Sequence, residues 1–128
     1  MKRLVGIIFS LLFIIAVSTT EIILSKKYIG EVLELSMSIA ESVNRETYYD
    51  QNHIDNVTKL EELWRHHENI LCLMTNHNNI DEVGEYITRM RTSQRDHDYE
   101  CFASSLALVI FYVEGYQHIF GINFQNLV

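Results

Sequence analysis

A long apolar stretch lies near the start of the sequence. It runs from Leu4 to Leu24 behind the basic pair Lys2 and Arg3, and Glu21 is its only charged residue. As a helix, these 21 residues span about 31 Å, which is enough to cross the hydrocarbon core of a membrane. We expect the following side chains to face lipid: Leu4, Ile7, Ile8, Phe9, Leu11, Leu12, Phe13, Ile14, Ile15 and Val17.

Two interpretations of this stretch remain open. The first is a single-pass membrane anchor formed by residues 1–27. The second is a cleaved signal peptide, because the small residues Ala16 and Ser18 place a cleavage site before Thr19 and would release a secreted protein. A very short basic N-terminus before an apolar run stays in the cytoplasm, so we expect residues 28–128 to form an extracytoplasmic domain at the cell membrane.

Four helices are predicted beyond the apolar stretch, because apolar residues recur there at every third or fourth position. Polar segments at 44–53, 75–79 and 95–98 separate them, and the chain contains no proline. The fold class is therefore all-α: an N-terminal transmembrane helix, then a four-helix domain of two αα-hairpins, packed as a bundle or a short helical-repeat array. The predicted apolar stripes are Tyr28, Val32, Leu35 and Ile39; Val57, Leu60, Trp64, His67, Leu71 and Met74; Ile80, Val83, Ile87 and Met90; and Tyr99, Phe102, Leu106, Val109, Val113, Tyr116 and Phe120.

The last predicted helix is apolar on nearly every face from Phe102 to Val113. Its uncharged run between Glu100 and Glu114 has 13 residues, fewer than the roughly 17 that a second membrane span needs. We therefore expect either a central core helix or one that also meets the bilayer surface or a partner, which would be a membrane protein or a second copy of the chain. The expected interaction surface consists of Phe111, Tyr112, Phe120 and Phe124.

The charge of the chain changes sign where the apolar stretch ends. The 128 residues carry 17 acidic and 10 basic side chains, but residues 1–27 are net +3 and residues 28–128 are net −10. An acidic domain does not suit nucleic-acid binding, which needs a basic face. An up-and-down packing would hold the two cysteines, Cys72 and Cys101, about 20 Å apart, so we expect free thiols.

Candidate metal ligands surround the second polar segment in the sequence: His66, His67, Cys72 and His77. These residue types bind zinc and copper, but no Cys-x-x-Cys, His-Glu-x-x-His or Glu-x-x-His spacing is present. We therefore expect structural histidines, no metal, no cofactor and no small-molecule substrate. Neighbouring carboxylates such as Glu61 and Glu62 are expected to be solvated.

The sequence is compatible with two interpretations of the protein's function. No nucleophile or base in the sequence is paired with an orienting group, so we expect no catalytic residues and no enzyme. The preferred interpretation is a non-catalytic interaction or accessory module outside the cytoplasm. The alternative is an extracytoplasmic sensory or ligand-binding domain that responds to a metal through the four candidate ligands.

The segment 76–90, Asn-His-Asn-Asn-Ile-Asp-Glu-Val-Gly-Glu-Tyr-Ile-Thr-Arg-Met, resembles the signature of domain-of-unknown-function family 4363. That family comprises small membrane-anchored proteins of clostridia and related Gram-positive bacteria. The resemblance implies a membrane location and a helical fold, and it implies no activity. Gly84 lies in this segment, where a glycine inside a helix costs about 1 kcal/mol relative to alanine. The positions that carry the resemblance are Trp64, Asn76, His77, Ile80, Asp81, Glu82, Arg89, Asp98, His118, Ile119, Asn126 and Leu127.

Overall fold

The computed structural model describes the backbone of residues 1–74 and 77–125, and the side chains of residues 1, 3–72 and 78–119. Four helices account for most of it: α1 (Lys2–Ser42), α2 (Gln51–Met74), α3 (His77–Asp96) and α4 (Tyr99–Gln125). The described part of the chain contains no strand. The all-α prediction is therefore confirmed, and the observed helices end and begin within or next to the three predicted polar segments.

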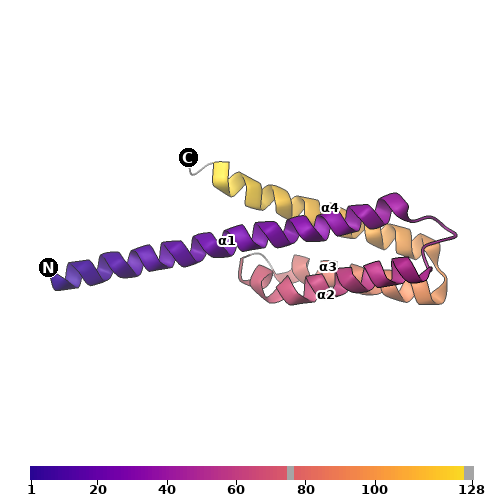
Figure 1. The fold of residues 1–128 in the computed structure, drawn as a ribbon, viewed down its shortest axis with the longest axis horizontal. Coiled ribbons are helices and arrows are strands. Elements are labelled where there is room, and N and C mark those ends of the chain that lie inside the picture. The colour runs from indigo at the N-terminus through magenta and orange to yellow at the C-terminus, as the bar shows by residue number, and fades with distance from the viewer. Residues whose placement is uncertain (75–76, 126–128) are drawn as a thin grey trace.

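The four helices run alternately up and down and form a closed ring (Figure 1). Each helix packs against its neighbours in the sequence, and α1 also packs against α4. In an open helical-repeat array, the first and last helices would lie apart. Of the two predicted packings, the contact between α1 and α4 therefore identifies a four-helix bundle.

The first helix is a single element that forms both the exposed apolar segment and one helix of the bundle. Helix α1 has 41 residues, and its side chains from residue 3 to residue 21 are all exposed. Its first buried side chain is Ser25, and from there to Ile39 the helix lies within the bundle. Figure 1 shows the N-terminal half of α1 extending well beyond the other helices. The helix has no break at the predicted boundary between residues 27 and 28.

The core consists of one apolar side chain per helical turn from each of the four helices. The stripes predicted for α2, α3 and α4 are confirmed wherever their side chains are described, with Tyr99 half-buried at the end of its helix. The side chains of Met74 and Phe120 lie outside the described residues. The buried apolar residues are Ile29, Val32, Ile39, Tyr48, Val57, Leu60, Trp64, Leu71, Ile80, Val83, Ile87, Met90, Phe102, Leu106, Val109, Val113 and Tyr116.

Half of the stripe predicted for α1 is confirmed, because Val32 and Ile39 are buried in the core. Ile29 and Ser36 are fully buried, whereas Tyr28 and Leu35 are only half-buried. Helix α1 packs against both α2 and α4, so its buried face points between these two neighbours and the predicted residues lie at its margin. Ser36 was missed because it is polar; its hydroxyl donates a hydrogen bond of 2.8 Å to the Val32 carbonyl, which allows its burial.

Tight turns close the end of the bundle farthest from the apolar part of α1. The Asn44 side-chain oxygen accepts hydrogen bonds of 2.9 and 3.0 Å from two backbone N–H groups of the turn that follows. His97 has a φ of 57°, a left-handed conformation that ends α3. Asp98 then caps α4, because its carboxylate accepts a hydrogen bond of 3.0 Å from the Cys101 N–H. We refer to this end of the bundle as the distal end.

Candidate functional site

The exposed half of α1 is the most conspicuous candidate site. Within the described residues, α1 alone is long and apolar enough to cross a membrane, with a mean hydropathy of 2.4 over its most apolar window. No residue of that window is buried in the bundle. All ten side chains predicted to face lipid are exposed, from Leu4 to Val17. A row of solvent-facing aliphatic and phenylalanine side chains of this length is suited to a hydrocarbon environment.

The candidate metal ligands are only partly brought together. His67 is buried and stacks on the Tyr28 ring with 3.4 Å between ring centroids, whereas its neighbour His66 is exposed. Cys72 is a half-buried free thiol one turn further along α2, and burial raises its pKa. His77 has no described side chain. Among the described residues, no three His, Cys, Asp or Glu side chains lie close enough together to hold a metal ion.

The environment of His67 makes the stability of the bundle depend on pH. Burial lowers the pKa of the His67 imidazole, the nearby His66 lowers it further, and Glu31 opposes the shift. The folded protein therefore binds fewer protons than the unfolded chain, whose histidines titrate near pH 6.5. As the pH falls below about 6.5, the free energy of unfolding should fall as well.

Urea unfolding at about pH 7.5 and 5.5 measures this effect. We expect His67→Gln to show a smaller loss of stability between the two pH values than the unmodified protein does. The matched control is His118→Gln, because His118 is exposed on α4 and should leave the pH dependence unchanged. An equal loss of stability in the His67 variant and the parent would contradict the assignment.

A second feature lies between α2 and α3, where Trp64 is buried against Gly84. A Cβ atom on Gly84 would lie 3.4 Å from the indole Nε1 and 3.6 Å from its Cδ1. A Cβ at these distances makes ordinary van der Waals contact with the indole ring, so only a side chain larger than that of alanine would collide with Trp64. The Trp64 indole N–H has no hydrogen-bond partner among the described residues.

Substituting Gly84 tests this close packing. Gly84→Val should lower the free energy of unfolding by about 1–3 kcal/mol, because the added carbons meet the Trp64 ring. The matched control is Gly115→Val on α4, where nothing lies within 4 Å of the added Cβ. That variant should gain a few tenths of a kcal/mol, because valine has a higher helix propensity than glycine. Chemical unfolding of both variants measures the difference, and equal effects would contradict the packing argument.

The expectation that Glu61 is solvated is wrong. Its side chain is nearly buried between α2 and α3, and it forms ion pairs of 2.8 Å with Arg65 and 2.7 Å with Arg91. A buried carboxylate needs such partners, because an unpaired charge is costly to remove from water. The sequence gives a partial signal, since Arg65 lies four residues after Glu61 on the same helix. Arg91 comes from α3 and could not be assigned without the packing.

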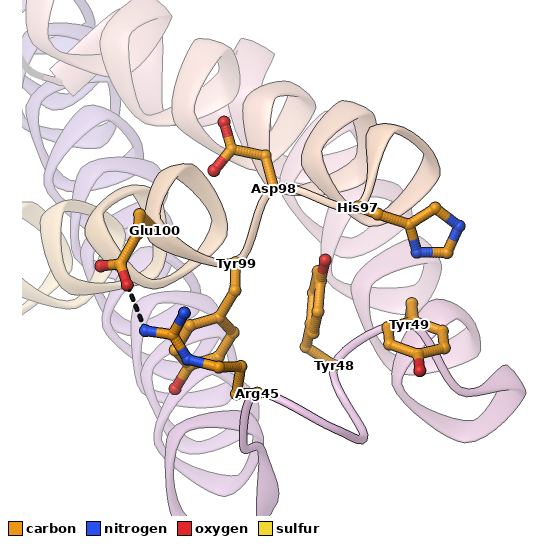
Figure 2. A pocket seen from close by; sticks show the side chains of 7 residues that line it. All are labelled: Arg45, Tyr48, Tyr49, His97, Asp98, Tyr99 and Glu100. Carbon is orange, nitrogen blue, oxygen red and sulfur yellow. Dashed lines mark hydrogen bonds and ion pairs between the residues drawn. The ribbon is translucent and has the colours of Figure 1, made fainter.

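A cluster of aromatic rings closes the distal end (Figure 2). Tyr48, from the turn between α1 and α2, is only 3% exposed. Its ring centroid lies 5.1 Å from that of Tyr49, 5.3 Å from Tyr99 and 5.5 Å from Phe102. The Gln94 side-chain amide donates a hydrogen bond of 2.7 Å to the Tyr48 carbonyl, which joins α3 to this turn. Burial raises the pKa of the Tyr48 phenol.

An open hollow of about 510 Å³ lies against this cluster, lined by residues of the two distal turns. Arg45 lies over the Tyr99 ring at 5.0 Å and forms an ion pair with Glu100 (Figure 2). His97 packs edge-on against Tyr49 on the other side, with 4.9 Å between ring centroids. Tyrosine and arginine are residue types enriched in recognition surfaces. The sequence did not indicate this hollow, because its residues come from polar segments 50 positions apart.

The expected interaction surface on α4 is only partly exposed. Phe111 is 68% exposed, and together with Leu108 and Ile119 it forms a stripe along the outer side of the helix, which we call the α4 stripe. Tyr112 is half-buried instead, because it stacks on Tyr86 of α3 at 5.9 Å. A groove of about 320 Å³ runs beside the stripe. The side chains of Phe120 and Phe124 lie outside the described residues.

The hydroxyl groups beneath the α4 stripe face Glu82 of α3. A hydrogen bond to Glu82 raises the pKa of Tyr112, and burial raises the pKa of Tyr116 to about 12. Glu82 is one of the positions that carry the family resemblance, and its contact with Tyr112 joins α3 to α4. The inward face of α4 is the buried stripe that includes Phe102, Val109 and Val113, and the α4 stripe lies outside it.

The remaining positions of the family resemblance have different environments. Trp64 and Ile80 are buried in the core, whereas Asp81 and His118 are exposed. Arg89 is exposed and forms an ion pair of 2.7 Å with Glu85. Asn76, Asn126 and Leu127, and the side chain of His77, lie outside the described residues. No family model, curated protein or solved structure matches this chain.

Proposed function

We propose that this chain is a single-pass membrane protein whose helical bundle is a non-catalytic interaction module outside the cytoplasm. Helix α1 crosses the membrane with its basic N-terminus in the cytoplasm, and the bundle lies directly on the outer surface. The chain is also proposed to belong to domain-of-unknown-function family 4363, on the strength of the segment 76–90.

The observation that supports the proposal is that one helix is both the apolar segment and a member of the bundle. Residues 3–21 of α1 are exposed, and Ile29, Val32 and Ile39 of the same helix are buried in the core. Cleavage before Thr19 would leave six residues of α1 ahead of the first buried side chain, Ser25, so the bundle itself would stay intact in a secreted form. An uncut α1 holds the bundle at a fixed orientation to the membrane, which suits an accessory module.

Membrane topology is tested by labelling intact cells with a membrane-impermeant maleimide. Glu46→Cys places a thiol on the exposed distal turn, in a background with serine at both native cysteines. We expect this thiol to react in intact cells, and a cysteine in a short tag before Met1 to react only after permeabilisation. The reverse pattern would contradict the orientation. Recovery of a labelled fragment beginning at Thr19 from the medium would contradict the anchor.

The part of the α4 stripe formed by Leu108 and Phe111 is the surface that we assign to a partner membrane protein. Leu108 and Phe111 lie 9 and 12 residues beyond the distal start of α4, so they face outward above the membrane surface at mid-height of the bundle. Isolated apolar residues are common on protein surfaces, but a stripe beside a groove is typical of a docking site.

A photo-crosslinking amino acid at position 111 tests the assignment in native membranes. We expect one defined crosslinked product of higher mass from position 111. The matched control is position 69, because Asn69 is exposed on the outer side of α2 and should give none. Equal crosslinking from both positions, or none from position 111, would contradict a partner on this face.

A further inference from the structure

The last part of α4 has the composition of a segment at a membrane surface. Glu114 is the last charged residue of the sequence, and the 14 residues from Gly115 to Val128 contain none. Helix α4 nevertheless continues to Gln125, three turns beyond Glu114. An uncharged helical end that carries aromatic and aliphatic residues is unusual on an acidic domain of net charge −10. A segment without charged side chains approaches lipid without the cost of removing a charge from water.

The register between α1 and α4 determines where this segment lies. At the distal end, Arg45 contacts Tyr99 and Glu100, so α4 begins level with the C-terminal end of α1. The helices are antiparallel, and the 20 residues from Tyr99 to Ile119 correspond to about 30 Å along the bundle. Ile119 therefore comes level with about Ser25 of α1, immediately beyond the apolar stretch that ends at Leu24.

The other helices end at the same level. His67 of α2 stacks on Tyr28 of α1, so Cys72 lies within a few residues of the level of Leu24. Figure 1 shows the end of α4 diverging from α1. The end of α4 is thus not covered by a neighbouring helix of the bundle, and Ile119 is 51% exposed.

We propose that residues 115–125 of α4 lie in the headgroup region of the same bilayer that α1 crosses, as a second, peripheral membrane contact. This inference rests on the proposed function, because it requires α1 to span the membrane. The lipid surface is the occupant that fits, since the segment is uncharged and comes level with the end of the span. With two contacts, the bundle would be held upright and would not rotate freely about α1.

Fluorescence quenching in vesicles tests this contact with the full-length protein. A polarity-sensitive fluorophore is attached to Ile119→Cys in a background with serine at positions 72 and 101, in vesicles of phosphatidylcholine and phosphatidylglycerol. We expect brominated acyl chains to remove most of its fluorescence and aqueous iodide to remove little. The matched control is Leu108→Cys, an exposed position on the same stripe that lies above the membrane surface. There we expect aqueous iodide to remove most of the fluorescence and brominated acyl chains to remove little.

A third label distinguishes failure of this inference from failure of the anchor. Leu12→Cys, in the middle of the apolar stretch, should be quenched by brominated lipid in either case. If position 12 is quenched by lipid while positions 119 and 108 are both quenched by iodide, the anchor stands and the peripheral contact is overturned. If position 12 is not quenched by lipid, the proposed anchor itself is overturned.

Discussion

Arginine at both Leu11 and Ile14 should release the full-length protein from the membrane. Both side chains lie in the middle of the apolar stretch, and they are 59% and 60% exposed. They therefore contact little else in the protein. An arginine at the centre of a membrane span costs about 2.5–3.5 kcal/mol on insertion scales, so the pair removes about 5–7 kcal/mol of insertion free energy. Fractionation followed by an alkaline carbonate wash measures the outcome.

The matched control places the same two charges at the end of the stretch. Glu21→Arg with Leu24→Arg keeps the three-residue spacing, but both positions lie at the boundary with the headgroups, where a charged side chain reaches water. We expect this variant to remain in the membrane after the wash. Circular dichroism of both variants should show an intact bundle. Retention of the central variant in the washed membrane would contradict a span by α1.

The helices and most of the core were predictable from the sequence, because their apolar residues recur with a clear helical period. The α3 stripe from Ile80 to Met90 is an example: each predicted position is buried. The α1 stripe was harder to predict. Tyr28 and Leu35 are seven residues apart along the helix, and so are the buried Ile29 and Ser36, so both pairs fit a helical period. Only the positions of α2 and α4 determine which of the two faces is covered.

The contacts between different helices and turns were much less predictable. Glu61 pairs with Arg91 across two helices, and Tyr48 packs against Tyr99 from a turn 51 positions away. Both contacts depend on helix packing, for which spacing along one helix gives no signal. The α4 stripe was half predictable for the same reason: Phe111 and Tyr112 are adjacent, and the contact with Tyr86 turns only Tyr112 inward.

The dual role of α1 predicts a sharp dependence of folding on where the chain is cut. A fragment of residues 25–128 should be soluble and should unfold cooperatively, because every side chain removed lies outside the core. A fragment of residues 40–128 should not fold. It lacks Ile29, Val32 and Ile39, each worth about 2–5 kcal/mol as a buried aliphatic side chain, and their sum is comparable to the stability of a whole domain.

A fragment of residues 28–128, cut at the boundary that charge and composition indicate, is the informative intermediate. It loses one buried side chain, Ser25, so we expect a cooperative transition at slightly lower urea concentration than that of residues 25–128. Circular dichroism during urea unfolding compares the three fragments. A cooperative transition in residues 40–128 would show that the bundle folds without α1. It would contradict the proposal that α1 couples the membrane span to the bundle by being part of both.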